Sequence, residues 1–468
     1  MRLKGLLLAL LFLLILSASC GKDQIIEDNS PEGVLPGADY IFDDTQLPQL
    51  YISVSESEWN RLLDLYDQEP HNHDYVKCST VSLVRGDATM RCKDVGLRLR
   101  GQTSRRRPEG SKGQPHKADN PKWHHVHFGL NCRTFADSGS FAGVRRINLK
   151  YAKEDPSYIR EHYCLDLLSN YGVWTAPKSS WCRLYLYVGN DSPAYYGVYL
   201  MMESIDKQYV KRRYGFGGQD GWLWKCAWGA NLRDTDDWRF HQDDNSPSTY
   251  AYELKDDNPE NFEPAKAQLK DFIKKLNTLK GAEFYNWIQK VCDVDLLLKS
   301  YAAMVALGHW DDYWNDMNNF YLYFSGTDLQ NYKVYMLPFD FDNTLGTSHH
   351  CGVQNDSGRH DPYHWGMEEC VLLYKILEVS DFRAKYTSYL SDFASVDNPW
   401  TGQLQSASRI RKWQNFISPF LKNATGEDMA IRDAPASWGN HPEYRLLEDG
   451  SNNWFKVKAE SIAYWISQ

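Results

Sequence analysis

Acidic and amide side chains gather between residues 309 and 346, in a pattern that could support phosphoryl transfer. Asp311 follows an apolar stretch, Asn318 comes seven residues later, and a strand–turn–strand pattern then leads to Asp340 and Asp342. Phosphoryl transfer requires one carboxylate near the acceptor and oxygen ligands for a divalent cation. Because side chains alternate along a strand, Asp340 and Asp342 should point to the same side. Two like charges so placed need a cation or a basic partner.

The order of these groups matches the catalytic loop of protein kinases, although the spacing does not. A kinase places a base-like Asp, a loop, a metal-binding Asn, a hairpin and a second metal-binding Asp in this order. Here Asp311 and Asn318 are more widely spaced than in a kinase, and the last motif is Asp-Phe-Asp rather than Asp-Phe-Gly. The alternative, without a catalytic role, is that this Asp-rich loop is a solvated turn or a set of helix caps.

Alternating and helical hydrophobic patterns predict the elements that would hold these groups. An apolar run at 50–54 predicts a strand, and Ser55 with Glu58 offers a capping box for a helix after it. The patterns predict a hairpin at 76–84 and 88–100, strands at 147–150, 183–188 and 197–202, and a hairpin at 319–324 and 333–337. They predict helices beginning at Asp155-Pro156-Ser157 and covering 263–278 and 293–307. A sheet-rich first half and a helix-rich second half favour one bilobal α+β unit.

Six ordered blocks resemble the CotH family of kinase-like spore-coat proteins, and the similarity runs from about residue 50 to residue 370. The blocks are Gly96–Ser104, Asp155–Ser157 with Arg160, Tyr196–Tyr199 with Glu203, Trp224-Lys225, Asn318–Tyr323 and Phe339–Gly346. The resemblance implies an atypical, secretory-type kinase fold that uses ATP and a divalent metal, Mg²⁺ or Mn²⁺. It also implies transfer of a phosphoryl group to a hydroxyl of a protein acceptor.

The resemblance places the family's functional residues on particular positions of this sequence. Its catalytic Asp falls on Asp311 and its metal-binding Asn on Asn318, and in both cases the next residue, of the same type, is an alternative. Its metal-binding Asp falls on Asp340 or Asp342. The implied site is therefore one catalytic carboxylate and a set of oxygen ligands for metal.

The expected nucleotide contacts begin at the Arg-Gly turn of the family, which falls on Arg100, Gly101 and Ser104. Backbone N–H groups of such a turn can face phosphates, although a hairpin end often needs a glycine for its shape alone. Family members often carry a Lys in the next strand, whereas residues 124–130 contain none here. Lys150, which precedes the helix containing Glu161, and Lys225 are the alternatives.

Two further features, a glutamate at a strand end and a cluster of histidines, can be interpreted either as functional or as ordinary solvent-exposed residues. Glu203 ends a strand, where a carboxylate is usually solvated, but the resemblance suggests that it orients a Lys or a metal. Histidines and a cysteine gather after the Asp-Phe-Asp block, at positions 349, 350, 351, 360 and 364. Their spacing suits no standard metal site, and we expect them to face solvent.

The first residues predict export and lipidation. Arg2 and Lys4 precede the apolar run 6–16, and small residues then lead to Cys20. This run is too short to span a bilayer and indicates a signal peptide over residues 1–20, with acylation at Cys20. Residues 21–38 are polar and rich in turn formers, which predicts a flexible tether before a kinase-like domain at 39–468. We therefore expect a bacterial protein anchored to a membrane by its lipid and facing the periplasm or the cell surface.

The net charge limits the classes of partner that the protein can bind, and the cysteine content limits the disulfides that it can form. The net charge of −9 becomes −11 when Arg2 and Lys4 are removed, which argues against nucleic acid as a partner. Nine cysteines remain after Cys20, with no CxxC pair. Two alternatives remain for Cys78 and Cys92: a disulfide bridge across their hairpin, or buried free thiols.

Other functions remain open beside the phosphotransferase. ATP is scarce outside the cytoplasm, so another phosphate donor or a degenerate pseudoenzyme fits the same motifs. The high content of Trp, 17 residues, also permits a non-enzymatic surface module that binds glycan or a partner protein. A glycoside hydrolase with paired carboxylates is the third alternative.

Overall fold

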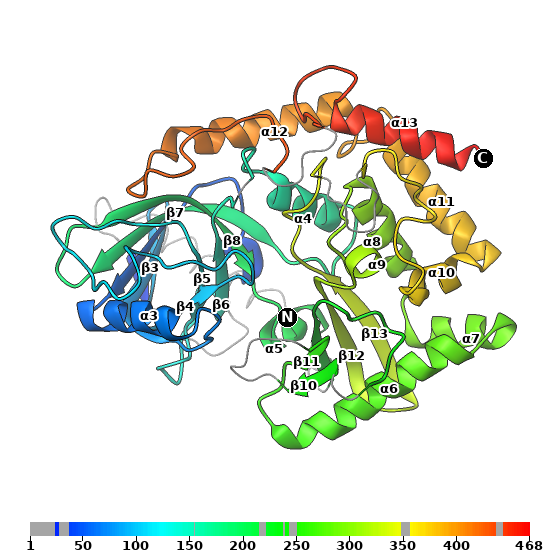
Figure 1. Cartoon of the computed structure of the whole chain (residues 1–468), viewed down its shortest axis with the longest axis horizontal. Helices are drawn as coiled ribbons and strands as arrows, with labels where there is room; N and C mark the ends of the chain where they lie inside the picture. Colours follow the sequence, from blue (N-terminus) through cyan, green and yellow to red (C-terminus); the bar gives the residue numbers. More distant parts are fainter. Residues whose placement is uncertain are drawn as a thin grey trace, which may run out of the picture.

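A computed structural model describes residues 24–27, 37–153, 155–214, 221–236, 239–242, 250–347, 356–436 and 443–468. The fold is mixed α/β, with a sheet-rich first half and a helix-rich second half (Figure 1). This coarse architecture confirms the sequence-based expectation. Cys20 lies outside the described residues, as do His349, His350 and Cys351.

The first sheet has eight strands in the order β1-β4-β3-β2-β7-β8-β6-β5. Because β4 also pairs with β5, strands β2 to β8 close on themselves. The strands are β1 (Gln24–Glu27), β2 (Gln49–Val54), β3 (Val76–Arg85), β4 (Ala88–Arg100), β5 (His127–Asn131), β6 (Arg146–Lys150), β7 (Ser179–Val188) and β8 (Ala194–Glu203). Closure brings the start of β5 beside the C-terminal end of β4 on one side and beside the C-terminal end of β6 on the other.

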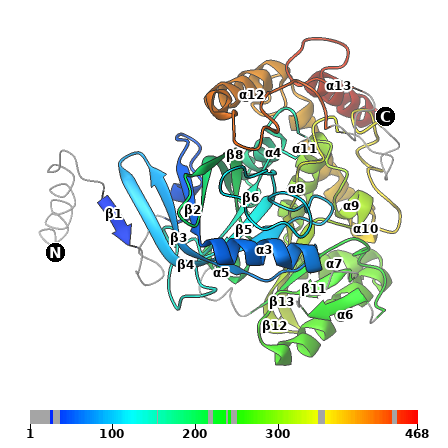
Figure 2. The ribbon, with the colours of Figure 1, turned by 60° about the vertical axis from the view of Figure 1, so that its left-hand side comes forward.

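Alternation along the strands builds the core of this sheet. Leu50, Ile52 and Val54 of β2 are buried while the residues between them are partly exposed. Helix α3 (Glu56–Gln68) begins at Ser55, whose hydroxyl accepts a hydrogen bond from the N–H of Glu58. α2 (Ala38–Ile41) and α3 pack on the same core, and β1, inside the expected tether, pairs in parallel with the start of β4 (Figure 2).

The second sheet has five strands in the order β10-β11-β9-β12-β13. They are β9 (Trp222–Cys226), β10 (Phe240–Gln242), β11 (Tyr252–Leu254), β12 (Phe320–Asp328) and β13 (Asn331–Pro338). β12 and β13 form the hairpin that the sequence predicts between Asn318 and Asp340. This hairpin therefore sets the separation between the two candidate metal-binding positions.

Helices dominate the second half. They are α6 (Phe262–Thr278), α7 (Gly281–Val291), α8 (Val294–Ala306), α9 (Tyr313–Asp316), α10 (Val371–Leu377), α11 (Ser380–Ala394), α12 (Gln403–Ile417) and α13 (Trp454–Ile466), and α4 (Arg160–Asn170) and α5 (Lys207–Tyr214) precede them in the first half. α8 is buried along almost its whole length and packs against α4 and α11. Within the described residues, none of the helices combines the length and apolar character needed to span a bilayer.

One local prediction is wrong, and one open choice is decided. Helix α4 begins at Arg160 rather than at Asp155-Pro156-Ser157, because the Asp155 carboxylate accepts hydrogen bonds from the N–H groups of Ser157 and Arg160 and Tyr158 has φ of +63°. Of the two alternatives for Cys78 and Cys92, the structure shows buried free thiols, because Cys78 lies opposite Val95 and not Cys92.

Candidate functional site

The candidate site lies where the end of β6, the start of α4 and the segment after β13 meet. Lys150 is the last residue of β6, Glu161 is the second residue of α4, and Asp340 lies two residues beyond β13. Lys150 Nζ is 2.5 Å from Glu161 Oε2, 2.5 Å from Asp340 Oδ1 and 3.8 Å from Asp342 Oδ2. The sequence predicted that the two aspartates need a cation or a basic partner, and Lys150 is such a partner.

The loop that carries the two aspartates is fixed by contacts with the helical half. Phe341, between them, is fully buried and packs against His309, with ring centroids 4.6 Å apart and the planes tilted by 39°. The N–H of Leu345 donates to the Leu307 carbonyl over 2.8 Å, and the buried Arg160 guanidinium donates to the Thr344 carbonyl over 3.2 Å. The carboxylates are therefore presented by a backbone anchored on both sides.

Asp311 is coupled electrostatically to Asp340 and Asp342, and two amides hold its carboxylate. Asn318 Nδ2 donates to Asp311 Oδ1 over 3.1 Å, and Asn343 Nδ2 donates to Asp311 Oδ2 over 2.9 Å. Asp312 instead caps α9, since its Oδ1 accepts the N–H of Asn315 over 2.9 Å. Of the two carboxylates, Asp311 is therefore the one that bonds to Asn318 and Asn343. Asn343 was not singled out from the sequence, although it directly follows the Asp-Phe-Asp motif.

The carboxylates of the site have perturbed protonation. Burial, with Asp316 and Asp340, raises the pKa of Asp311 to about 7. Burial and Asp340 raise the pKa of Asp342 to about 7 as well. Burial also acts to raise the pKa of Asp340, but Lys150 outweighs it and holds that pKa below its ordinary value. One Lys thus fails to neutralise the whole group, and added positive charge would stabilise it.

The donors fit a hard divalent cation. Asp340 and Asp342 supply carboxylate oxygens, the Asn318 amide supplies a carbonyl oxygen, and Mg²⁺ or Mn²⁺ prefers such oxygen ligands. Lys150 contacts Asp340 and Asp342, and Asn318 bonds to Asp311, which acts electrostatically on Asp342.

Basic side chains lie on the sheet side of the site. Arg98 and Arg100 alternate with buried leucines on β4 and so share one face, and Arg100 lies opposite His127 of β5. Burial, together with Arg98 and Arg100, lowers the pKa of Arg105 to about 10. Burial, with Arg98, Arg105 and other cations, lowers the pKa of His73 to about 4, which indicates a positive local potential.

The Arg-Gly turn adjoins these cations. Gly101 has φ of +101°, where any other residue would be strained, and a Cβ there would also lie 2.2 Å from Ser104 Oγ. The Gly101 carbonyl accepts a hydrogen bond from Arg105 Nε over 2.9 Å. Lys225 also contributes to the positive potential around His73, and its Nζ lies 4.0 Å from Glu253 Oε2. Lys225 therefore belongs to this basic group, while Lys150 lies among the carboxylates.

Glu203 is the predicted site residue that the structure does not bring into the group. Its side chain is fully buried and accepts hydrogen bonds from Arg213 Nη1 over 2.8 Å and from Arg212 Nη2 over 2.9 Å. The N–H of Lys178 also donates to it over 3.1 Å. The expectation that Glu203 orients a Lys or a metal is replaced by an anchoring role for α5, on which both arginines lie.

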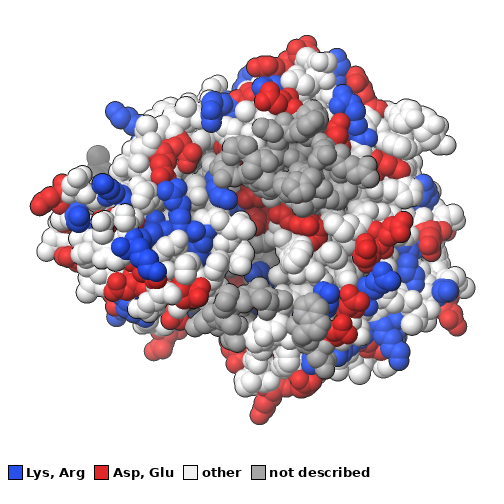
Figure 3. Space-filling model, viewed as in Figure 1, with Lys and Arg blue, Asp and Glu red and all other residues white. Residues whose placement is uncertain are grey.

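A pocket adjoins Lys150. Its lining includes Lys150, Glu161 and Asp342 together with the aromatic side chains of Tyr151 and Trp181. In the same view as Figure 1, acidic atoms follow a hollow near the middle of the surface, and basic atoms gather on the part formed by the first sheet (Figure 3). An anionic ligand with a bound cation would match this separation of charge.

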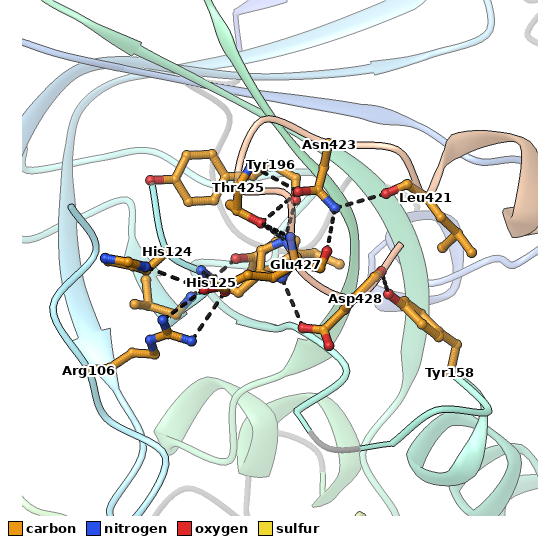
Figure 4. Close-up of polar contacts among 12 residues, drawn as sticks. Arg106, His124, His125, Tyr158, Tyr196, Leu421, Asn423, Thr425, Glu427 and Asp428 are labelled. Carbon is orange, nitrogen blue, oxygen red and sulfur yellow. Dashed lines mark hydrogen bonds and ion pairs between the residues drawn. The ribbon is translucent and has the colours of Figure 1, made fainter. Parts of the chain in front are cut away.

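The segment from Leu421 to Asp428, which sequence reasoning missed, fastens the C-terminal part to the sheet half (Figure 4). Glu427 accepts hydrogen bonds from both Arg106 Nη groups, at 3.2 and 2.8 Å, and from the N–H of His125 at 3.0 Å. His125 Nδ1 lies 3.2 Å from Asp428 Oδ2. His125, Glu427 and Asp428 have donor atoms within 4.8 Å of one another, but hydrogen bonds already occupy Glu427, so we assign a latch rather than a metal site.

The histidines after the Asp-Phe-Asp block do not assemble a site in the described residues. His360 Nε2 is 3.0 Å from the His364 carbonyl oxygen, and His364 Nδ1 is 2.7 Å from Asp361 Oδ2. No described side chain links either ring to Asp340 or Asp342 by a hydrogen bond.

Comparison with known families identifies the class of protein. Residues 97–446 match the model of the CotH kinase protein family, so the chain belongs to that family. The match continues beyond residue 370, where the sequence resemblance was expected to end.

Three relatives resemble the chain. The inner spore coat protein H of Bacillus subtilis is 29% identical over 262 residues, which are 55% of this chain and 64% of the relative. Invasin CotH2 of Rhizopus delemar is 22% identical over 92% of this chain and 66% of its own length. Invasin CotH3 of the same organism is 21% identical over 82% of this chain and 58% of its own length. The chain thus spans less than two thirds of each relative.

Proposed function

We propose that the chain is a metal-dependent phosphotransferase that moves the γ-phosphoryl group of ATP to a hydroxyl of an envelope or surface protein. The observation that carries this proposal is the contact of Lys150 with both Glu161 and Asp340. Protein kinases use the same combination: a strand Lys paired with a helix Glu, facing the metal-binding Asp that follows a hairpin. Family membership supports the same activity.

The charged walls of the site suit the two parts of a metal–nucleotide complex. The triphosphate would lie along the Arg100–Ser104 turn and Lys150, where backbone N–H groups and cations are available. A divalent cation held by Asn318, Asp340 and Asp342 supplies neutralisation of the charge that develops on the phosphate oxygens. The sheet half and the helical half would then act as the two lobes of a kinase-like fold.

Asp311 is assigned the acceptor side of the reaction. Its two amide contacts, Asn318 and Asn343, fix the plane of the carboxylate. In the transfer, the acceptor oxygen forms a bond to the γ-phosphorus, the bond from that phosphorus to the bridging oxygen breaks, and ADP leaves. Asp311 takes the proton of the acceptor hydroxyl, and a carboxyl with a pKa near 7 is suited to that exchange at neutral pH.

Export and a lipid anchor at Cys20 complete the proposal. They would place the enzyme on the outer side of a bacterial membrane, where its acceptor would be another envelope or surface protein. The name of one relative, an inner spore coat protein, fits a surface location.

The geometry gives little support to the two other functions, glycan binding and glycoside hydrolysis. A glycan-binding surface calls for many exposed indoles, but only Trp174 and Trp228 of the described tryptophans are largely exposed. A glycoside hydrolase calls for two carboxylates facing each other across a cleft, whereas Glu161 and Asp340 converge on Lys150.

The test is transfer of label from γ-labelled ATP in the presence of Mg²⁺ or Mn²⁺. Self-labelling, labelling of an envelope fraction and release of free phosphate would be measured for the wild type and for Asp311→Asn. Asp119→Asn, an exposed Asp in a loop, is the matched control. Activity lost only in Asp311→Asn supports the proposal, whereas wild-type protein without transfer or hydrolysis refutes it.

A further inference from the structure

His127 lies at the border between the acidic and the basic sides of the site, although no part of the proposed reaction uses it. It begins β5, is 5% exposed and lies opposite Arg100 in the register of the sheet. Lys150 and Asp340 both act electrostatically on its ring. A polar side chain at such a position is expected to have hydrogen-bond partners.

The ring nitrogens of His127 lack such partners. Nδ1 is buried and has no hydrogen-bond partner, and Nε2 forms no hydrogen bond with any residue that the structure describes. The Cδ2 edge, which adjoins Nε2, faces the Arg-Gly turn, because a Cβ on Gly101 would lie 3.4 Å from Cδ2. An orphaned buried N–H is rarer than an orphaned acceptor, so the proton of the neutral ring belongs on Nε2, on the side of the turn.

Stacking fixes the direction of this N–H group. The His127 ring is stacked on Tyr151, with centroids 4.5 Å apart and planes inclined by 28°. The His125 ring stacks on the same tyrosine at 5.5 Å. His125 is itself held at Nε2 by the Tyr196 carbonyl at 2.8 Å and at Nδ1 by Asp428, within the latch of Figure 4. The unpaired donor is therefore preorganised before any ligand arrives.

We propose that His127 Nε2–H donates a hydrogen bond to a phosphoryl oxygen of the nucleotide held at the Arg100–Ser104 turn. This inference rests on the proposed function. Because the contact is with phosphate, it distinguishes phosphorylated ligands from the nucleoside.

Calorimetric titration of the purified protein with Mg²⁺·ATP, Mg²⁺·ADP and adenosine tests the contact. His127→Leu removes the donor, His127→Gln keeps an amide N–H near the position of Nε2, and His364→Leu alters an exposed histidine elsewhere. We expect His127→Leu to weaken ATP and ADP binding about tenfold. Adenosine binding should not change, His127→Gln should retain most of the affinity, and His364→Leu should match the wild type.

Three outcomes overturn the inference. If His127→Leu binds ATP with wild-type affinity, the proposed contact does not exist, and the proposed function is unaffected. Equal losses for ATP and adenosine, or a lowered melting temperature with no rescue in His127→Gln, show a purely structural role. A wild-type protein that binds no nucleotide at all refutes the proposed function, and the inference fails with it.

Discussion

Lys150 and Glu161 form an ion pair that joins the last residue of β6 to the first turn of α4, with Nζ 2.5 Å from Oε2. Lys150 also contacts Asp340, which lies 190 residues further along the chain. A strand, a helix and the loop after a hairpin are thereby fixed at one point. The carboxylates around Lys150 outweigh its burial and raise its pKa, so it stays charged.

Removing the cation should destabilise the protein because Glu161 and its neighbours would be left as uncompensated negative charge. We expect Lys150→Met to lower the free energy of unfolding by about 3 kcal/mol near neutral pH, measured by chemical denaturation. The double variant Lys150→Met/Glu161→Gln should recover part of this loss, since it removes one buried charge. Unchanged stability of Lys150→Met would show that the pair contributes nothing to the fold.

The carboxyl of Asp342 should make stability depend on pH. Burial and Asp340 raise its pKa to about 7 in the folded state, against an ordinary value near 4. The folded state then binds more protons than the unfolded state between these values, so the contribution of Asp342 to stability falls as pH rises. The stability of Asp342→Asn relative to the wild type should therefore increase between pH 5 and pH 8 in metal-free buffer. Denaturation curves at several pH values test this, and a constant difference contradicts it.

Glu203 should be structural and not catalytic. Replacing its buried carboxylate by an amide leaves Arg212 and Arg213 poorly paired. We expect Glu203→Gln to lower the free energy of unfolding by about 2–3 kcal/mol, with nucleotide affinity unchanged at a temperature where the variant is folded. Thermal denaturation and nucleotide titration on the same sample separate the two effects. Nucleotide affinity lost in a fully folded variant would restore the functional role expected from the sequence.

The latch around Glu427 should hold the C-terminal segment on the sheet half. Its forked contact with Arg106 is partly exposed, so we expect Glu427→Ala to cost about 1–2 kcal/mol. The same variant should speed proteolytic cleavage near residues 421–428. Glu368→Ala, at an exposed position, is the control. Identical cleavage rates in the two variants would argue against a latch.

The sequence was most informative where structure depends on local patterns. Alternation correctly predicted β2 and the β12–β13 hairpin, and the charge argument correctly predicted a basic partner for Asp340 and Asp342. Alternation depends only on neighbours in the chain, and two close carboxylates need a positive charge whichever segment supplies it.

The remainder depends on contacts that local patterns do not encode. The start of α4 was misplaced because the Asp155 side chain competes with the helix for backbone N–H groups. The pairing of Glu203 with Arg213 and that of Glu427 with Arg106 arise only when distant segments meet. The position of Lys150 among the carboxylates likewise required the closure of the first sheet, which brings β6 to them.

The central claim is that the group around Lys150 binds a metal–nucleotide complex. Calorimetric titration of the purified protein with ATP, with and without Mg²⁺ or Mn²⁺, tests it most directly when repeated on Asp340→Asn. We predict saturable binding that requires the metal and is lost in Asp340→Asn while the variant remains folded. Absence of binding in the wild type, or binding that ignores both the metal and Asp340, would contradict it.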